Sequence, residues 1–308
     1  MKRREFFKKT IGAGVFAGLS ASMLNFKDII ASHDNKKISA PYDLVAIKGG
    51  NPVEMFDEAI KAMGGIQTFV KKNQIVVVKP NIGWDLPPER AANTDPTLVG
   101  RIVEHCIQAG AKKVYVFDNT VNEWTRCYKN SGIEDAVKKA GGIMVSGKDE
   151  KYYQEIEIKN GKSLKNAKVH ELILQADVFI NVPILKTHGG TGLSLAMKNL
   201  MGVVWDRGYW HRNNLHQCIA DFVTFKKPHL NVIDGYRVLA RNGPRGVSEA
   251  DVVQMKYLIL SPDIVAADAA ATKIFGWDIN KVPHISMAEE MGVGIANLQK
   301  LNIKRITL

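Results

Sequence analysis

The sequence has 308 residues, of which 45% are hydrophobic and 24% charged, and its formal net charge is +11. These proportions are typical of a packed globular protein, and the length suits one large α/β domain or two smaller ones. The positive charge suits an anionic ligand. It does not favour nucleic acid, because no stripe of lysine and arginine interleaved with aromatic residues is present. The three cysteines lie far apart without a Cys-x-x-Cys pair, so we expect no iron–sulfur cluster from the chain's own cysteines.

The N-terminal segment resembles a twin-arginine export signal. The pair Arg3-Arg4 precedes aromatic residues, a lysine and a weakly apolar stretch, Ile11 to Leu24, that is too short and too mild for a stable transmembrane helix. The alternative is the basic N-terminus of a cytoplasmic protein. We expect an exported protein, in the periplasm or on the outer face of the cytoplasmic membrane. Its signal, 1–31, would contact the membrane transiently or remain as an uncleaved anchor, and a linker, 32–41, would precede a single α/β domain, 42–308.

Strands and helices alternate along the rest of the chain. Short β-branched runs predict strands, and apolar residues at helical spacing predict helices. In chain order we expect strands at 44–47, 75–79, 112–117, 141–145, 152–158, 178–182, 230–233, 256–260 and 303–307, and helices at 52–63, 95–109, 133–139, 193–204, 215–225, 263–275 and 288–291. This alternation predicts the α/β class, with an open, largely parallel sheet and helices on both faces.

The most informative stretch runs from Ala176 to Trp205. A buried strand leads into Lys186-Thr187-His188 and then into a glycine-rich turn containing Gly190 and Gly192, after which we expect a helix from Leu193. Backbone N–H groups at such a strand-to-helix turn can hold an anion, although many turns of this kind hold nothing. Ligands in open α/β sheets bind beyond the carboxyl ends of the strands. We therefore expect the glycine-rich turn to lie at the central crevice.

Several predicted strands end in polar residues, which would converge on this crevice if the strands are parallel neighbours. The pairs are Lys79/Asn81, Asp118/Asn119, Lys186/His188 and Asp234/Gly235. The candidate residues for binding an anionic small molecule or cofactor are cationic and amide side chains, two glycines and one carboxylate: Lys79, Asn81, Gly190, Gly192, Lys198, Asn199 and Asp234.

His188 and Lys186 are the candidate catalytic residues. A histidine beside cations has a lowered pKa, so it is neutral and available as a base near neutral pH. The alternative is a structural histidine. His211 and His216 are candidate metal ligands because imidazole suits nickel, iron and zinc. Their spacing is loose for a ligand pair, and the alternative is a tryptophan-rich loop whose histidines only form hydrogen bonds.

Together these motifs resemble a family known only as a domain of unknown function, number 362. Many of its members are similar to iron–sulfur proteins through an added ferredoxin-type cysteine module, which this chain lacks. The resemblance extends over nearly all of residues 42–308. Its motifs are Lys79-Pro80-Asn81, Ala92 to Pro96, Gly110-Ala111-Lys112, Leu185 to His188, Met197 to Gly202, Asp234-Gly235, Gly243 to Gly246, Asp263, Asp268 and Met291 to Gly294.

A more distant resemblance concerns mechanism. The segment from His188 to Lys198 is similar to the histidine–glycine–lysine motif of nickel-pincer lactate racemases, in which a lysine carries the pincer nucleotide. This resemblance implies that Lys198 would hold an anionic, nucleotide-like cofactor and that His188 would transfer protons. It also implies that His211 or His216 would approach a metal such as nickel, iron or zinc. Asn199 and the tryptophan-rich loop depart from the racemase pattern, so racemisation does not follow.

These observations lead to two main hypotheses about function and a weaker third, a metal-free enzyme that acts on an anionic substrate. The first is an exported, cofactor- or metal-associated enzyme of redox or isomerase type that acts on an anionic small molecule. The second is a non-catalytic carrier of a cofactor or anion, or a maturation factor, that serves an exported redox partner. The residues of the crevice would be the same in both.

Overall fold

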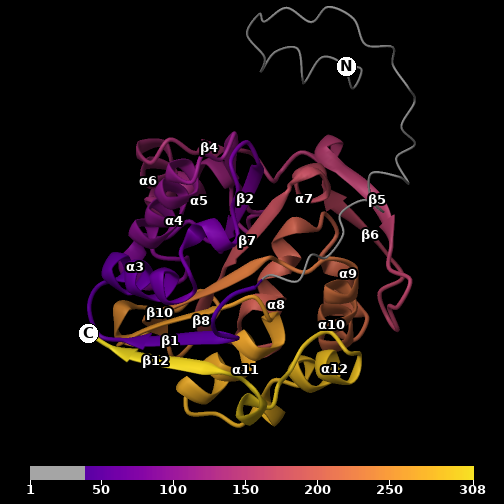
Figure 1. Cartoon of the computed structure of the whole chain (residues 1–308). Helices are drawn as coiled ribbons and strands as arrows, with labels where there is room; N and C mark the ends of the chain where they lie inside the picture. Colours follow the sequence, from indigo (N-terminus) through magenta and orange to yellow (C-terminus); the bar gives the residue numbers. More distant parts are fainter. Residues whose placement is uncertain (1–38) are drawn as a thin grey trace, which may run out of the picture. The chain divides into compact units, whose positions relative to one another are not determined.

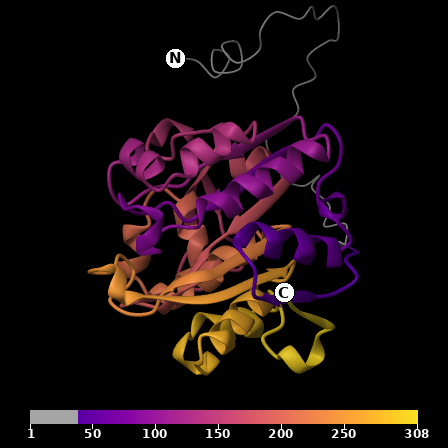
Figure 2. The same cartoon turned by 90° about the vertical axis from the view of Figure 1, so that its left-hand side faces the viewer.

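The computed structural model describes residues 39–308, which lie in one compact unit. The predicted export signal, 1–31, and most of the predicted linker, 32–41, lie outside the described residues. A twisted sheet runs through the unit, and helices lie on both of its faces (Figure 1; Figure 2, after a quarter turn). The predicted α/β class is confirmed. Within residues 39–308, no helix combines the length and the apolar character that crossing a bilayer requires.

Twelve strands are present among the described residues, and their positions follow the apolar runs of the sequence. They are β1 (Leu44–Lys48), β2 (Ile75–Pro80), β3 (Lys113–Val116), β4 (Ile143–Met144), β5 (Tyr153–Glu157), β6 (Asn166–His170), β7 (Val178–Val182), β8 (Ile184–His188), β9 (Gly192–Ser194), β10 (Leu230–Leu239), β11 (Val252–Ser261) and β12 (Ile303–Thr307).

Ten of these strands form the main sheet, in the order β12-β1-β11-β10-β7-β2-β3-β4, with β8 beside β10 and β9 beside β8. The run from β10 through β7, β2 and β3 to β4 is parallel, and β12 is parallel to β1. β11 is antiparallel to both of its neighbours, and β9 is antiparallel to β8. The parallel run therefore brings the carboxyl ends of its strands to one edge of the sheet.

The helices divide between the two faces of the sheet. They are α3 (Pro52–Ala62), α4 (Pro96–Gln108), α5 (Trp124–Asn130), α6 (Ile133–Lys139), α7 (Glu171–Gln175), α8 (Ala196–Asn199), α9 (Gly208–Arg212), α10 (Leu215–Phe225), α11 (Ile264–Ile274) and α12 (His284–Glu290). α3 to α6 cover one face, where they pack on alternate strand residues such as Val76 and Val78. α7 to α12 cover the other face, where Val77 and Phe179 point. Because successive residues of a strand point to opposite faces of the sheet, each strand contributes side chains to both hydrophobic cores.

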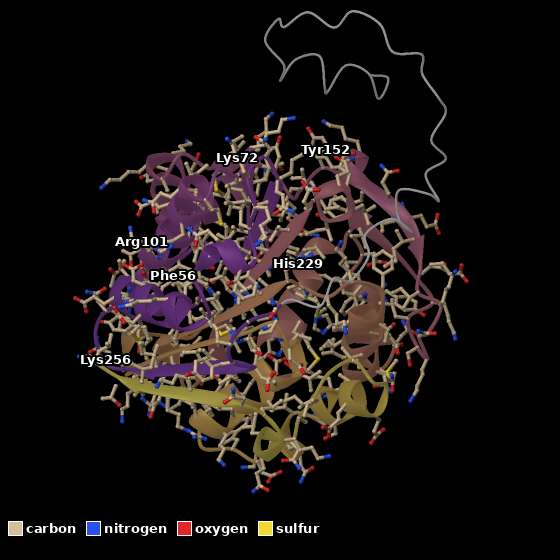
Figure 3. The ribbon with its side chains drawn as sticks, in the orientation of Figure 1. Phe56, Lys72, Arg101, Tyr152, His229 and Lys256 are labelled. Carbon is tan, nitrogen blue, oxygen red and sulfur yellow. The ribbon has the colours of Figure 1, made fainter. Side chains whose placement is uncertain are left out.

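α3 and α4 show how local sequence signals set the helix boundaries. Asn51 and Glu54 form a capping box at the start of α3, and Asp95 caps α4, which begins with Pro96. The two helices are joined by Arg101 of α4, whose Nε and Nη2 donate to the two carboxylate oxygens of Asp57 at 2.8 and 2.9 Å. Figure 3 shows Arg101 above Phe56, which lies on α3.

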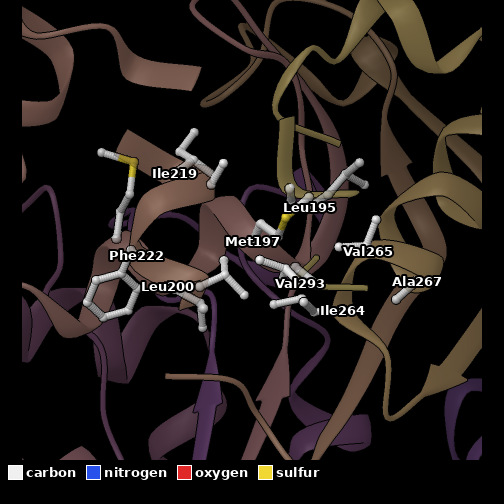
Figure 4. Packing of buried hydrophobic residues seen from close by; sticks show 14 of the residues in the cluster. Leu195, Met197, Leu200, Ile219, Phe222, Ile264, Val265, Ala267 and Val293 are labelled. Atoms are coloured by element: carbon white, nitrogen blue, oxygen red, sulfur yellow. The ribbon is translucent and has the colours of Figure 1, made fainter. Parts of the chain in front are cut away.

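The structure corrects the predicted glycine-rich strand-to-helix turn. The turn joins two antiparallel strands, β8 and β9, and Leu193 pairs with Thr187 across this hairpin. The helix begins only at Ala196. Asp268 of α11 accepts hydrogen bonds from the backbone N–H groups of Ala196 and Met197, at 2.6 and 3.0 Å, which satisfies the start of α8. Helical spacing was misleading here because this short segment is buried on several sides against α10 and α11 (Figure 4).

Other differences are local. The segment 159–168, in which no strand was predicted, contains the start of β6, which pairs with β5 in a separate two-stranded sheet. β10 extends to Leu239, six residues beyond the predicted strand end at 233. The short helices α5, α7 and α9 were not predicted from the sequence.

Candidate functional site: a cationic cavity

A cavity of about 110 Å³ lies beyond the carboxyl ends of β2, β3 and β8. It is lined by four cationic side chains and one carboxylate, together with two histidines and Asn81 and Asn199: Lys79, Lys186, Lys198, Arg207, Asp118, His188 and His211. We call it the cationic cavity. Three of the four predicted strand-end clusters therefore meet, as the parallel sheet requires.

Lys79 and Asp118 form a buried ion pair in the wall of this cavity. Lys79 is 1% exposed, and its Nζ lies 2.9 Å from Oδ1 of Asp118. The same Nζ donates to the carbonyl of Pro80 and to Oδ1 of Asn199. Gly202 makes this packing possible, since a Cβ there would lie 1.8 Å from Asp118 Oδ1. Burial lowers the pKa of Lys79, and the negative charge of Asp118 opposes that shift.

Lys186 comes from β8 and is also 1% exposed. Its Nζ donates to Oδ1 of Asn81 at 3.2 Å and to the carbonyl of Ala92. These partners are neutral, so the ammonium has hydrogen bonds but no ion pair within residues 39–308. Burial first, and then the charge of Lys198, lowers the pKa of Lys186 to about 7.

Lys198 comes from α8 and is half-buried. Within the described part of the chain, its Nζ makes one hydrogen-bond contact, to the thioether sulfur of Met201 at 3.8 Å. A thioether is a weak acceptor, so the ammonium is poorly satisfied by the protein itself. Burial first, and then the charge of Arg207, lowers the pKa of Lys198 to about 7.

Arg207 enters the cavity from the loop before α9. Its Nη1 and Nη2 donate to the carbonyls of Asn119 and Thr120, both at 2.6 Å. These bonds fix the guanidinium against the loop that follows β3, and burial lowers its pKa. Arg207 thus adds a fixed positive charge beside Lys198.

His188 stands at the end of β8 with its ring orientation set by the hairpin. Its Nδ1 accepts a hydrogen bond from the backbone N–H of Gly190 at 3.0 Å. Burial foremost, and then Lys198, lowers the pKa of His188 to about 3, so the ring is neutral near pH 7. A neutral ring that accepts at Nδ1 carries its proton on Nε2. This geometry favours a hydrogen-bond donor over the general base that we expected.

The two candidate metal ligands have different partners. The His211 ring stacks near that of His188, with centroids 6.5 Å apart, whereas Nδ1 of His216 lies 3.0 Å from Nδ1 of His284. Among residues 39–308, no group of three or more histidine, cysteine, aspartate or glutamate side chains is arranged to hold a metal ion. The side chains of this part of the chain therefore do not by themselves fit the predicted metal site.

Three of the predicted ligand-binding residues lie away from the cationic cavity. Asp234 accepts from the backbone N–H groups of Asp95 and Tyr236, at 2.8 and 3.0 Å, and so joins β10 to the start of α4. It is not at a strand end, because β10 continues for five more residues. Gly190 and Gly192 belong to the hairpin, and a Cβ at Gly192 would lie 2.7 Å from the carbonyl of Lys281. None of these three residues lines the cationic cavity.

Sequence reasoning did not select Asp118 or Arg207 as site residues. Asp118 was noted only as a polar residue at a strand end. The signal that could have selected it is the presence of lysines in the neighbouring motifs, because a buried lysine needs a negatively charged partner. Arg207 gave a weaker signal. It is a basic residue in a polar and aromatic loop directly after the central motif.

The model of the family described as "Domain of unknown function (DUF362)" matches residues 76–273, well over half of the chain. A thylakoid-associated protein of Synechocystis sp. is 24% identical over 242 residues, which cover 76% of this chain and 73% of that protein. The structure of the lactate racemase apoprotein from Thermoanaerobacterium thermosaccharolyticum has a TM-score of 0.49 and 12% sequence identity. That match covers 77% of this chain but only 57% of the racemase chain.

Proposed function

We propose that this protein, which belongs to the DUF362 family of unknown function, binds a small anionic molecule in the cationic cavity and catalyses proton transfer on it. One observation carries the proposal: four cationic side chains line the cavity, and its one carboxylate is already paired with Lys79. Lys186 and Lys198 therefore lack a counter-charge among the described residues. A phosphate or carboxylate group would supply it through charge-assisted hydrogen bonds.

The size of the cavity limits the ligand. Its volume of about 110 Å³ is below the roughly 300–1,000 Å³ of sites that enclose a drug-sized ligand. It suits one phosphate or carboxylate group, or a compact molecule with two such groups. A nucleotide-like cofactor would have to place only its anionic group there.

The lysines also suit proton transfer. A group whose pKa lies near the working pH can both accept and release a proton efficiently, and burial brings the pKa of Lys186 and of Lys198 to about 7. His188 would donate from Nε2 to an oxygen of the bound molecule. These side chains alone supply acid–base chemistry, so the proposal favours the isomerase type over the redox type.

Calorimetric titration with inorganic phosphate at pH 6.5 tests the binding step. We expect Lys198→Met to weaken phosphate binding at least tenfold, because it removes the least satisfied charge of the cavity. Lys226→Met is the matched control, since Lys226 is a half-buried lysine that does not line the cavity. Equal phosphate affinity in Lys198→Met and in the unsubstituted protein would contradict the proposal.

A non-catalytic carrier, delivering an anion or cofactor to an exported redox partner, is the second candidate. The hydrogen bond from Gly190 to His188 favours it, because the neutral ring then has no free lone pair and cannot act as a general base alongside the lysines. Malonate in D₂O separates the two functions. The enzyme should speed the incorporation of deuterium at the central carbon of malonate, as followed by NMR, and Lys186→Met should lose this activity. A carrier would bind malonate without accelerating exchange.

A further inference from the structure

A second and larger cavity, of about 520 Å³, lies between the main sheet and α11. Its floor is one face of the two neighbouring strands β1 and β12, where Leu44 is aligned with Ile303, and Ala46 with Arg305. α11 forms the opposite wall through Ala270, Lys273 and Ile274, which share one side of the helix. We call it the amphipathic groove. β1, β12 and α11 lie together near the C-terminus in Figure 1.

The floor of the groove is apolar, and its rim is basic. Leu44 and Ala270 are buried at its bottom, and Ile274, Leu298 and Ile303 add further apolar surface. The charged residues that line the groove are all basic, namely Lys48, Lys273 and Arg305. All three are exposed, and among residues 39–308 none has an ion-pair partner. Lys48 lies over the ring of Tyr257, which leaves Lys273 and Arg305 as the free charges of the rim.

We propose that the amphipathic groove binds a single-chain anionic amphiphile, with the apolar chain on the floor and one carboxylate or phosphate group at Lys273 and Arg305. An apolar floor gains free energy when it covers an alkyl chain. A basic rim without acidic residues selects the sign of the head group. The volume lies within the usual range for sites that enclose small ligands.

This site is separate from the one proposed above. None of the residues that line the amphipathic groove also lines the cationic cavity. The two proposals therefore fail independently. Phosphate at a concentration that saturates the cationic cavity should leave binding in the groove unchanged.

Calorimetry with decanoate, below its micelle-forming concentration, tests the inference on the full chain. With the cationic cavity saturated by phosphate, we expect one decanoate per chain, and at least tenfold weaker binding to the double variant Lys273→Gln, Arg305→Gln. Lys304→Gln is the matched control. Lys304 is also exposed on β12, but strand alternation places it on the opposite face from Arg305. Thermal unfolding of each variant should match the unsubstituted protein, because all three side chains are at the surface.

A cationic detergent and a lipid vesicle test what kind of ligand the groove binds. Decyltrimethylammonium has the same chain with a positive head group, and we expect no binding. Equal binding of both probes, or full decanoate affinity in the double variant, would overturn the inference. Binding only to phosphatidylglycerol vesicles, with none to free decanoate, would replace the enclosed ligand by a membrane surface. Loss of decanoate binding as the protein dimerises would assign the groove to a second copy of the chain.

Discussion

The cationic side chains of this protein occupy two contrasting environments. At the α3–α4 contact, Arg101 meets both oxygens of Asp57 and also Glu104, and these hydrogen bonds raise the pKa of Arg101. In the cationic cavity, Lys186 and Lys198 face neutral partners, and their pKa values fall. The protein thus provides a charged partner at the contact that joins two helices and leaves Lys186 and Lys198 of the cavity without one. A charge that is buried without a counter-ion costs stability, and the proposed anionic ligand would offset that cost.

Lys79 lies between these two extremes, and breaking its pair should have the largest effect. Asp118→Asn keeps an acceptor for the backbone N–H of Ile82 but removes the charge that balances Lys79. We expect the free energy of unfolding in urea at pH 7 to fall by about 3–5 kcal/mol, the usual result of leaving one partner of a buried pair.

The double variant Lys79→Met, Asp118→Asn provides the control for that loss. It replaces the unpaired ammonium by an apolar side chain of similar length, and so should recover at least half of the lost stability. A loss below about 1 kcal/mol in Asp118→Asn alone would mean that the pair behaves as a surface ion pair.

The dependence of folding stability on pH tests whether Lys198 is buried without a counter-charge. Its pKa of about 7 in the folded protein lies below the ordinary value of 10.5. Between these two values the unfolded chain holds a proton that the native state has released, so stability rises with pH. Below pH 7 both states are protonated, and the cost of the buried charge is complete. Lys198→Met removes this cost, and it should therefore be more stable than the unsubstituted ligand-free protein at pH 6.

That advantage of Lys198→Met should shrink steadily as the pH rises from 7 to 9.5, as measured by urea unfolding. Lys300→Met, at an exposed position, is the control and should show no such trend. A stability difference between Lys198→Met and the unsubstituted protein that stays constant with pH would mean that Lys198 keeps its proton in the folded state.

The smallest effect is expected at the paired site. Arg101→Gln removes a partly exposed ion pair, with side chains 29% and 33% exposed for Arg101 and Asp57. Such pairs contribute about 1 kcal/mol or less, so the urea midpoint should fall only slightly, and phosphate affinity should not change. A phosphate defect in Arg101→Gln would show that the α3–α4 contact influences the cavity.

The positions of these charges were predictable from the sequence where strand geometry decides them. Lys79 and Asn81 were placed at one edge because they end or follow a β-branched run, and Lys186 and His188 because they come after the predicted strand 178–182. The structure brings all four together, although Lys186 and His188 belong to β8, which was not predicted. The alternation of short apolar runs with amphipathic segments gave the α/β class in the same way, since periodicity is a property of the local sequence.

Tertiary contacts determine the positions of the residues that were not placed correctly from the sequence. Asp234 was misplaced because the pairing of β10 with β11 carries the strand past it to Leu239, and no local signal marks that extension. His211 and His216 are close in sequence, yet they lie on different helices and face different partners. Arg207 reaches the cavity because its guanidinium binds two carbonyls from a distant loop. Contacts of this kind depend on the packing of the whole domain.

The position of β1 in the sheet has a consequence for biosynthesis. β1 is among the first described elements to leave the ribosome, but its two neighbours are β11 and β12, which are made last. Until then the apolar residues of β1 have no strand beside them, and pairing across such a sequence separation is slow. Residues 44–48 therefore remain without their strand partners until the last elements of the chain have been made.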